Sequence, residues 1–166
     1  MVPMSIRGPW LDSVTPIAPP ASARPTYRFV LYAGVVTGAY SGVICLILYV
    51  FARVIGVPFE VQGVGGVAVL PWIVVLLIPL AAGVAGAALA GLLRGVRFGG
   101  RIVLLIGTVL ALLSCISPIV QPAEVIWSTR IWLLVMHVIT WLLVVPQIAR
   151  IVGDADPGAF EEREEN

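Results

Sequence analysis

FVLYAGVVTGAYSGVICLILYVFA, residues 29–52, contains no charged residue and lies between Arg28 and Arg53. A helix rises about 1.5 Å per residue and the hydrocarbon core of a bilayer is about 30 Å thick, so about 20 apolar residues cross it. These 24 residues therefore predict a membrane-spanning helix. Three further uncharged stretches predict three more spans, at about 70–93, 102–121 and 131–149.

The composition supports a membrane environment for most of the chain. Of its 166 residues, 60% are hydrophobic and 11% are charged, whereas a soluble domain is about 45–50% apolar and about 25% charged. A formal net charge of +1 leaves no global basic field that would recruit nucleic acid, so no nucleic acid partner is expected. We expect an all-α integral membrane four-helix bundle.

Prolines and charges divide the chain into three parts. Residues 1–26 hold six prolines, which lack the amide hydrogen that a helix needs, so they predict a disordered arm. Residues 27–152 form the transmembrane domain, and residues 153–166 form an acidic tail.

The arginines predict how the chain is oriented. Eight of the ten belong to the arm, to the connection between the second and third spans, and to the tail. Only Arg53 and Arg130 lie on the opposite side. The positive-inside rule therefore places both termini in the cytoplasm.

Small residues follow one another at a spacing of four in the first two spans. Such residues let helix backbones approach closely inside a bilayer. The second span carries two adjacent ridges of this kind, and the second ridge consists of Ala82, Gly86 and Ala90. Packing within one bundle and a dimer face both fit this pattern. The candidate packing residues are Gly34, Gly38, Gly42, Gly83, Ala87 and Gly91.

A polar stripe is expected along the fourth span, facing the bundle interior. It consists of Arg130, His137, Thr140 and Gln147, which fall within about 100° of arc on a helix. His137 is either a neutral imidazole bonded to a neighbouring helix or part of a proton relay or ligand site. Pro79 and Pro146 are expected to kink the second and fourth spans.

Cys45, Cys115 and His137 lie at similar depth in the outer half of their spans. Two thiols and an imidazole are a possible site for Cu(I) or zinc, although a buried cysteine more often fills space as a small apolar residue. We expect no metal and no cofactor. The sequence also lacks a recognisable catalytic motif, so an enzyme is not expected.

The outer loops hold two charges of each sign. We expect ion pairs between Arg53 and Glu60 and between Glu124 and Arg130. The glycine-rich segment 62–66 predicts a flexible turn into the second span.

Several segments together resemble an actinobacterial family of four-span membrane proteins, known as domain of unknown function 6069. They are LILYVFARVIGV (46–57), the Ala/Gly-rich second span, LLSCISP (112–118), LVMH (134–137), Val145-Pro146 and Arg150. The resemblance covers about residues 28–152. It implies four helices in a membrane and no established activity.

These observations favour a non-catalytic accessory, scaffolding or interaction protein of the bacterial inner (plasma) membrane. Its expected partners are the lipid bilayer and either further copies of itself or a larger membrane complex. The alternative is a small transporter or pore with a polar pathway along the fourth span.

Overall fold

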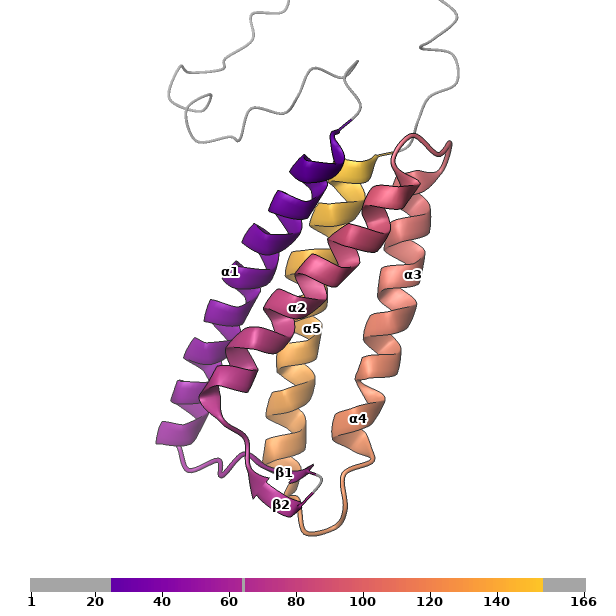
Figure 1. Cartoon of the computed structure of the whole chain (residues 1–166). Coiled ribbons are helices and arrows are strands. Elements are labelled where there is room, and N and C mark those ends of the chain that lie inside the picture. The colour runs from indigo at the N-terminus through magenta and orange to yellow at the C-terminus, as the bar shows by residue number, and fades with distance from the viewer. Residues whose placement is uncertain (1–24, 64, 154–166) are drawn as a thin grey trace, which may run out of the picture.

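The computed structural model describes residues 25–63 and 65–153, so the predicted arm and acidic tail lie almost entirely outside the described part. Four helical segments are long and apolar enough to cross a membrane, which confirms the predicted all-α four-helix architecture. Figure 1 shows their arrangement. The elements are α1 (Tyr27–Val54), β1 (Glu60–Gly63), β2 (Gly66–Val69), α2 (Trp72–Ala90), η1 (Gly91–Leu93), α3 (Gly99–Ser114), α4 (Ile116–Ile119) and α5 (Trp127–Val152).

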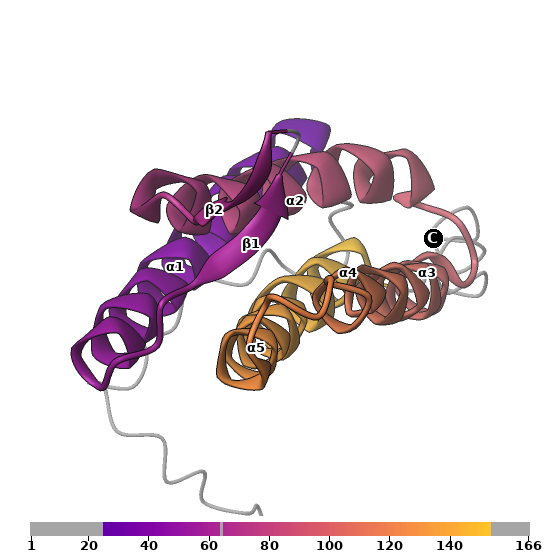
Figure 2. The ribbon, with the colours of Figure 1, turned by 90° about the horizontal axis from the view of Figure 1, so that it is seen from below.

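The helices form two layers. The first layer holds α1 and α2, which pack along much of their length, and the second holds α3, α4 and α5 (Figure 2). Helix α5 contacts α1 and so joins the layers, whereas α2 and α3 make few contacts although they follow one another in the chain. The start of α1, the end of α5 and the α2–α3 connection share one end of the molecule (Figure 1).

The first and last helices extend beyond the predicted spans by two to four residues at each end. Thr26 begins α1 because its Oγ1 accepts a hydrogen bond from the Phe29 amide at 3.2 Å. Arg28, Arg53, Arg130 and Arg150 therefore lie inside helical turns. A long arginine side chain can reach the polar interface from such a turn, so the gaps between charges identify the apolar centre of each helix and not its ends.

The third candidate span runs from Gly99 to Ile119, close to the predicted stretch from 102 to 121, but it contains a one-residue break in the helix. Helix α3 ends at Ser114 and the single turn α4 follows Cys115. Pro118 has no amide hydrogen for the carbonyl of Ser114, four residues earlier, so the helical bonding cannot continue unchanged. Pro79 and Pro146, in contrast, lie inside α2 and α5, which continue on both sides of them.

The segment expected to be a flexible turn is a β-hairpin. Strands β1 and β2 pair antiparallel, with Gln62 opposite Val67 and Gly63 opposite Gly66. Gly66 has φ +110°, a conformation that side chains rarely adopt and that closes the tight turn. The expected turn therefore lies at the tip of the hairpin, and the sequence did not predict the strand pairing on either side of it.

Two anchors hold the hairpin against the helices. Phe59, immediately before β1, is fully buried, and its ring centroid lies 4.6 Å from that of Tyr49. The Tyr49 hydroxyl donates to the carbonyl of Leu70 at 2.9 Å. The hairpin thus covers the end of the bundle opposite the arginine-rich connection (Figure 1).

Candidate functional site

The α1–α2 interface is built from the small residues that the sequence singled out. A Cβ atom added at Gly83 would lie 2.5 Å from the Gly34 carbonyl oxygen and 2.8 Å from the Cα of Gly38. One added at Gly42 would lie 2.6 Å from the Leu76 carbonyl oxygen. Gly34 also faces Ala87, and Gly91 lies under the Tyr27 ring. These candidate packing residues are therefore brought together within one chain.

The second ridge of α2 faces a different neighbour. Ala82, Gly86 and Ala90 line a groove of about 470 Å³ between α2, α3 and α5. A Cβ at Gly86 would meet only the Ile148 side chain, at an ordinary 3.8 Å. Helix α2 thus uses one small-residue face for tight packing. Its own chain covers the adjacent face only in part, since Ala90 is buried, Gly86 is half-buried and Ala82 is exposed.

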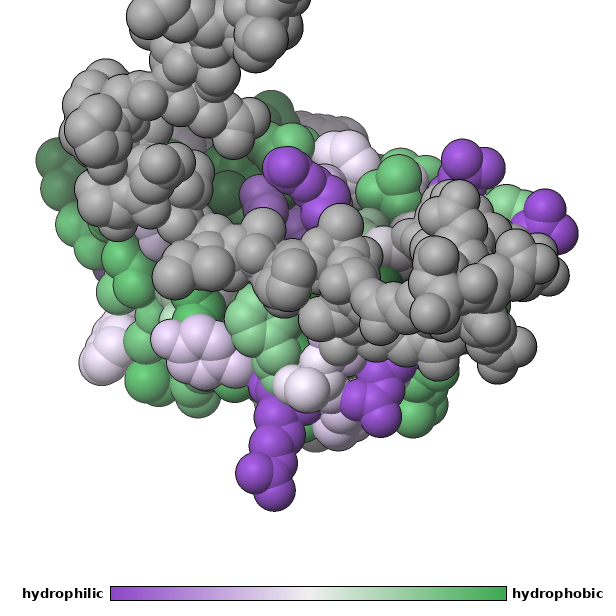
Figure 3. Space-filling model, turned by 90° about the horizontal axis from the view of Figure 1, so that it is seen from above, coloured by the Kyte–Doolittle hydropathy of each residue, from purple (hydrophilic) through white to green (hydrophobic). Residues whose placement is uncertain are grey.

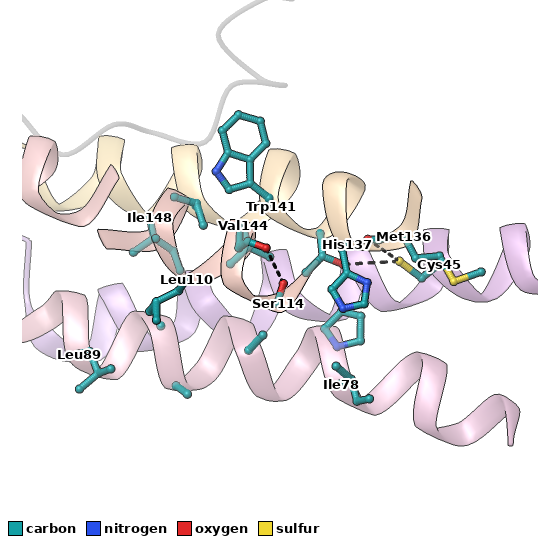
Figure 4. A pocket seen from close by; sticks show the side chains of 18 of the residues that line it. Cys45, Ile78, Leu89, Leu110, Ser114, Met136, His137, Trp141, Val144 and Ile148 are labelled. Carbon is teal, nitrogen blue, oxygen red and sulfur yellow. Dashed lines mark hydrogen bonds between the residues drawn. The ribbon is translucent and has the colours of Figure 1, made fainter. Parts of the chain in front are cut away.

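The groove is apolar and open on one side. Leucine, isoleucine, valine and alanine make up most of its lining (Figure 4). Leu89 and Leu110 line it from α2 and α3, yet their side chains are 64% and 55% exposed. The only buried residues of α3 are Gly99, Gly100 and Val103. The opening lies between α2 and α3, where the predicted membrane hydrocarbon would surround it.

A small polar cluster lies in the part of the groove nearer the hairpin. His137 Nδ1 is 2.7 Å from the Leu133 carbonyl oxygen, which can only accept, so Nδ1 carries the hydrogen. The Ser41 hydroxyl donates to Thr140 Oγ1 at 3.2 Å, and the Cys45 thiol lies 3.7 Å from the Met136 carbonyl. Figure 4 shows His137 and Cys45 toward one end of the pocket, and Leu89 and Ile148 toward the other.

The residues of the predicted polar stripe do not all face the bundle interior. His137 and Thr140 line the groove, but Gln147 is exposed and is not among the lining residues. Arg130 is 8% exposed and donates to the carbonyls of Ile119, Pro122 and Val125 at 2.7–3.0 Å. The prediction of a continuous stripe was wrong because an arc of about 100° on a helix is wide enough to meet different surroundings at each depth.

Both predicted ion pairs are replaced by bonds to backbone carbonyls. Arg53 donates to the Pro58 carbonyl at 2.8 Å, and Arg130 binds the three carbonyls given above. Within the described ranges no ion pair joins either arginine to Glu60 or Glu124. Each arginine instead satisfies carbonyls of the non-helical connection beside it, which have no helical donor.

The candidate metal ligands do not converge. Cys45 is buried against Thr140 and Met136, whereas Cys115 lies at the break between α3 and α4. Among residues 25–63 and 65–153, no three histidine, cysteine or acidic side chains form a group that could hold a metal. Similar depth in a membrane does not imply proximity, because depth leaves the position around the bundle undetermined.

Arginines gather at the end of the molecule that holds the start of α1 and the end of α5. Five exposed arginines lie there among the described residues, and Figure 3 shows hydrophilic side chains at several separate places on this face. Arg94 lies over the Tyr27 ring at 5.6 Å, and Arg97 and Arg101 lie over the Phe98 ring at 5.2 and 5.6 Å. The five are Arg28, Arg94, Arg97, Arg101 and Arg150.

The groove and its lining were not predicted as a site. The sequence identified the second ridge, but nothing in one sequence shows that α2 and α3 stand apart. The sequence signal that could have indicated the opening is the pair of adjacent small-residue ridges on α2. One neighbouring helix can cover only one of these ridges.

Comparison with known proteins identifies the family and nothing finer. Neither the curated proteins nor the solved structures contain a significant match to the chain. A family model described as a family of unknown function, DUF6069, matches residues 25–154. This match includes every described helix and strand and the whole groove. The chain therefore belongs to the family of unknown function DUF6069.

Proposed function

We propose that the protein is a non-catalytic accessory or interaction protein of a bacterial plasma membrane, with both termini in the cytoplasm. Its interaction surface is the groove between α2 and α3, which accepts an apolar partner from within the bilayer. The partner enters sideways between the two helices and not along the bundle axis.

One observation carries the proposal: the second ridge of α2 lines an open apolar groove, in which Ala82 is exposed and Gly86 is only partly buried. Small residues on a membrane helix allow close approach of a neighbour, and on the first ridge they are used in that way. Side chains with reactive groups near the groove are engaged in structural bonds. His137 bonds to Leu133, and Thr140 bonds to Ser41.

The alternative function is a small transporter or pore. It is favoured by the polar atoms of His137, Thr140 and Cys45 at the groove. A conducting pathway would extend that cluster toward both membrane surfaces. Against it, Gln147 is exposed away from the groove and Arg130 is buried among loop carbonyls.

Water accessibility separates the two functions. In a Cys45→Ala/Cys115→Ala background, a Thr140→Cys variant is treated with a membrane-impermeant maleimide. A groove filled by an apolar partner predicts no labelling at 140. The matched controls are Gln62→Cys on the exposed hairpin, which should be labelled, and Leu142→Cys on the outer face of α5, which should not. Labelling at 140 at the rate seen at 62 would establish a wetted pathway and overturn the proposal.

Association is the second test. The chain is extracted in gentle detergent and its mass is measured with bound molecules retained. The proposal predicts a bound apolar molecule or membrane protein that is lost in Gly86→Leu, which fills the groove, and kept in Ala81→Leu, on an exposed part of α2 outside it. A bare monomer in all three samples would contradict the proposal.

A further inference from the structure

We propose that the groove binds one acyl chain of an anionic membrane phospholipid, whose phosphate lies at the arginines of the α2–α3 connection. This inference rests on the proposed function, because it names the apolar partner that the same groove accepts. It depends on the shape of the groove, on its opening and on the charges at one of its ends.

The groove is long, and the free space in it is small. It runs beside α2 from Leu70 to Leu93, a length of about 35 Å by helix rise, and its volume is about 470 Å³. A single extended hydrocarbon chain is a membrane component whose shape suits a long apolar space of this kind.

The opening faces the place where acyl chains are most concentrated. Leu89 and Leu110 border it and are more than half exposed. A lipid tail can therefore slide in from the surrounding bilayer without leaving hydrocarbon or crossing a polar barrier. An apolar solute from water would first have to cross the headgroup region.

Three arginines belong to the segment that links the α2 side of the groove to its α3 side. The lining of the groove ends at Leu93 of η1, after α2, and continues on α3 from Val103. Arg94, Arg97 and Arg101 occupy the connection and first helical turn between these two residues, and all three are exposed. Guanidinium groups bind phosphate by paired hydrogen bonds, and the described residues at this end carry no acidic side chain.

The position of the polar cluster fits a tail from one leaflet. On α5, His137 lies 13 residues before Arg150, which is about 20 Å by helix rise. One leaflet contributes about half of the roughly 30 Å hydrocarbon thickness. A tail anchored at the arginine end therefore stops before His137 and contacts only the apolar part of the groove.

The headgroup is tested on the full chain. Purified and delipidated protein is mixed with dioleoyl phosphatidylglycerol or dioleoyl phosphatidylcholine, and bound lipid is counted by native mass spectrometry. One phosphatidylglycerol per chain should bind more tightly than phosphatidylcholine. The double variant Arg94→Gln/Arg97→Gln should lower phosphatidylglycerol affinity roughly 30-fold, the loss expected for two arginines near an anionic headgroup.

The charge control is Arg53→Gln, which removes an exposed arginine in the last turn of α1, at the opposite end of the molecule (Figure 1). It should change the affinity by less than about twofold, since its charge is remote from the arginines of the α2–α3 connection. The six acidic residues after Gly153 are present throughout, so any competition from them is included in the measurement. Equal affinity for the two lipids would overturn the headgroup assignment.

The groove is tested with Gly86→Leu against Ala81→Leu. The first should weaken binding of both lipids and the second neither, while gel filtration and thermal unfolding confirm that both variants fold. Unchanged binding to Gly86→Leu would place the lipid elsewhere and overturn the inference. If position 140 is not labelled and the groove binds a membrane protein but no lipid, the proposed function stands and the lipid inference is refuted. A wetted groove would refute the proposed function itself.

Discussion

Gly83 and Gly86 lie three residues apart on α2 and have opposite surroundings. Gly83 faces the backbone of α1 at distances that leave no room for a methyl group, whereas Gly86 faces the groove. The same residue type therefore has two purposes on one helix. At Gly83 the missing side chain permits two helices to touch, and at Gly86 it widens the groove.

A methyl group added at each of these two glycines should affect stability differently. Gly83→Ala forces α1 and α2 apart and should reduce stability by about 1–3 kcal/mol, the usual cost of overpacking. Gly86→Ala should leave stability within about 0.5 kcal/mol of the wild type, as for a substitution that creates no clash. Thermal unfolding in mild detergent measures both. Equal effects of the two variants would show that Gly83 is not a packing contact.

Arg130 has a structural role that the predicted polar stripe did not indicate. Its guanidinium satisfies three carbonyls of the α4–α5 connection. Arg130→Lys keeps the charge but cannot reach all three acceptors, so we expect a loss of about 1.5–3 kcal/mol. Arg53→Lys is the matched control, since Arg53 is exposed and binds one carbonyl, and it should cost less than about 1 kcal/mol. The prediction fails if unfolding of the two variants in detergent is indistinguishable.

At the scale of the elements, the helices were predictable and the pieces between them were not. Each apolar stretch between arginines is long enough to span a bilayer, and that constraint alone locates four helices. The break at Cys115 and the hairpin at 60–69 depend on single backbone positions, Pro118 and Gly66, whose effects vary with context. Likewise, the candidate packing glycines could be predicted because close approach requires them, whereas the groove depends on where α3 stands relative to α2.

The hairpin depends on a tyrosine that the sequence does not mark as special. Tyr49 is 8% exposed, stacks against Phe59 and donates to the Leu70 carbonyl. Tyr49→Phe keeps the ring contact and removes one bond, so it should cost about 0.5–1.5 kcal/mol. Hydrogen exchange should rise in residues 60–69 and stay unchanged in α3. Tyr40→Phe, at an exposed site on the same helix, is the control. An unchanged hairpin would show that Phe59 alone holds it.

At the scale of the whole molecule, the two layers share one strongly joined side and one open side. Helix α5 joins them through its contacts with α1 and α2, and within the second layer the Gly100 amide at the start of α3 donates to the Gly153 carbonyl after α5 at 2.8 Å. The α2–α3 side has only the connection at one end to bridge it. This open side lies next to the arginine cluster, and the combination suits a lipid-like partner. The proposed ligand therefore follows from the way the two layers are joined.

Orientation is the last property that the charges predict. Five arginines are exposed at the end that holds the start of α1 and the end of α5, while both described arginines at the other end bind loop carbonyls. Cytoplasmic loops retain an excess of arginine, so reporters fused at residue 1, after Gly95 or at Asn166 should be active inside the cell. A reporter inserted after Gly65, in the hairpin, should be active outside. Replacing Arg94, Arg97 and Arg101 by glutamine should weaken this preference and give a mixed population, because the charge bias then depends on the remaining arginines. A reporter at Asn166 that is active outside would reverse the assignment and move the proposed lipid to the opposite leaflet.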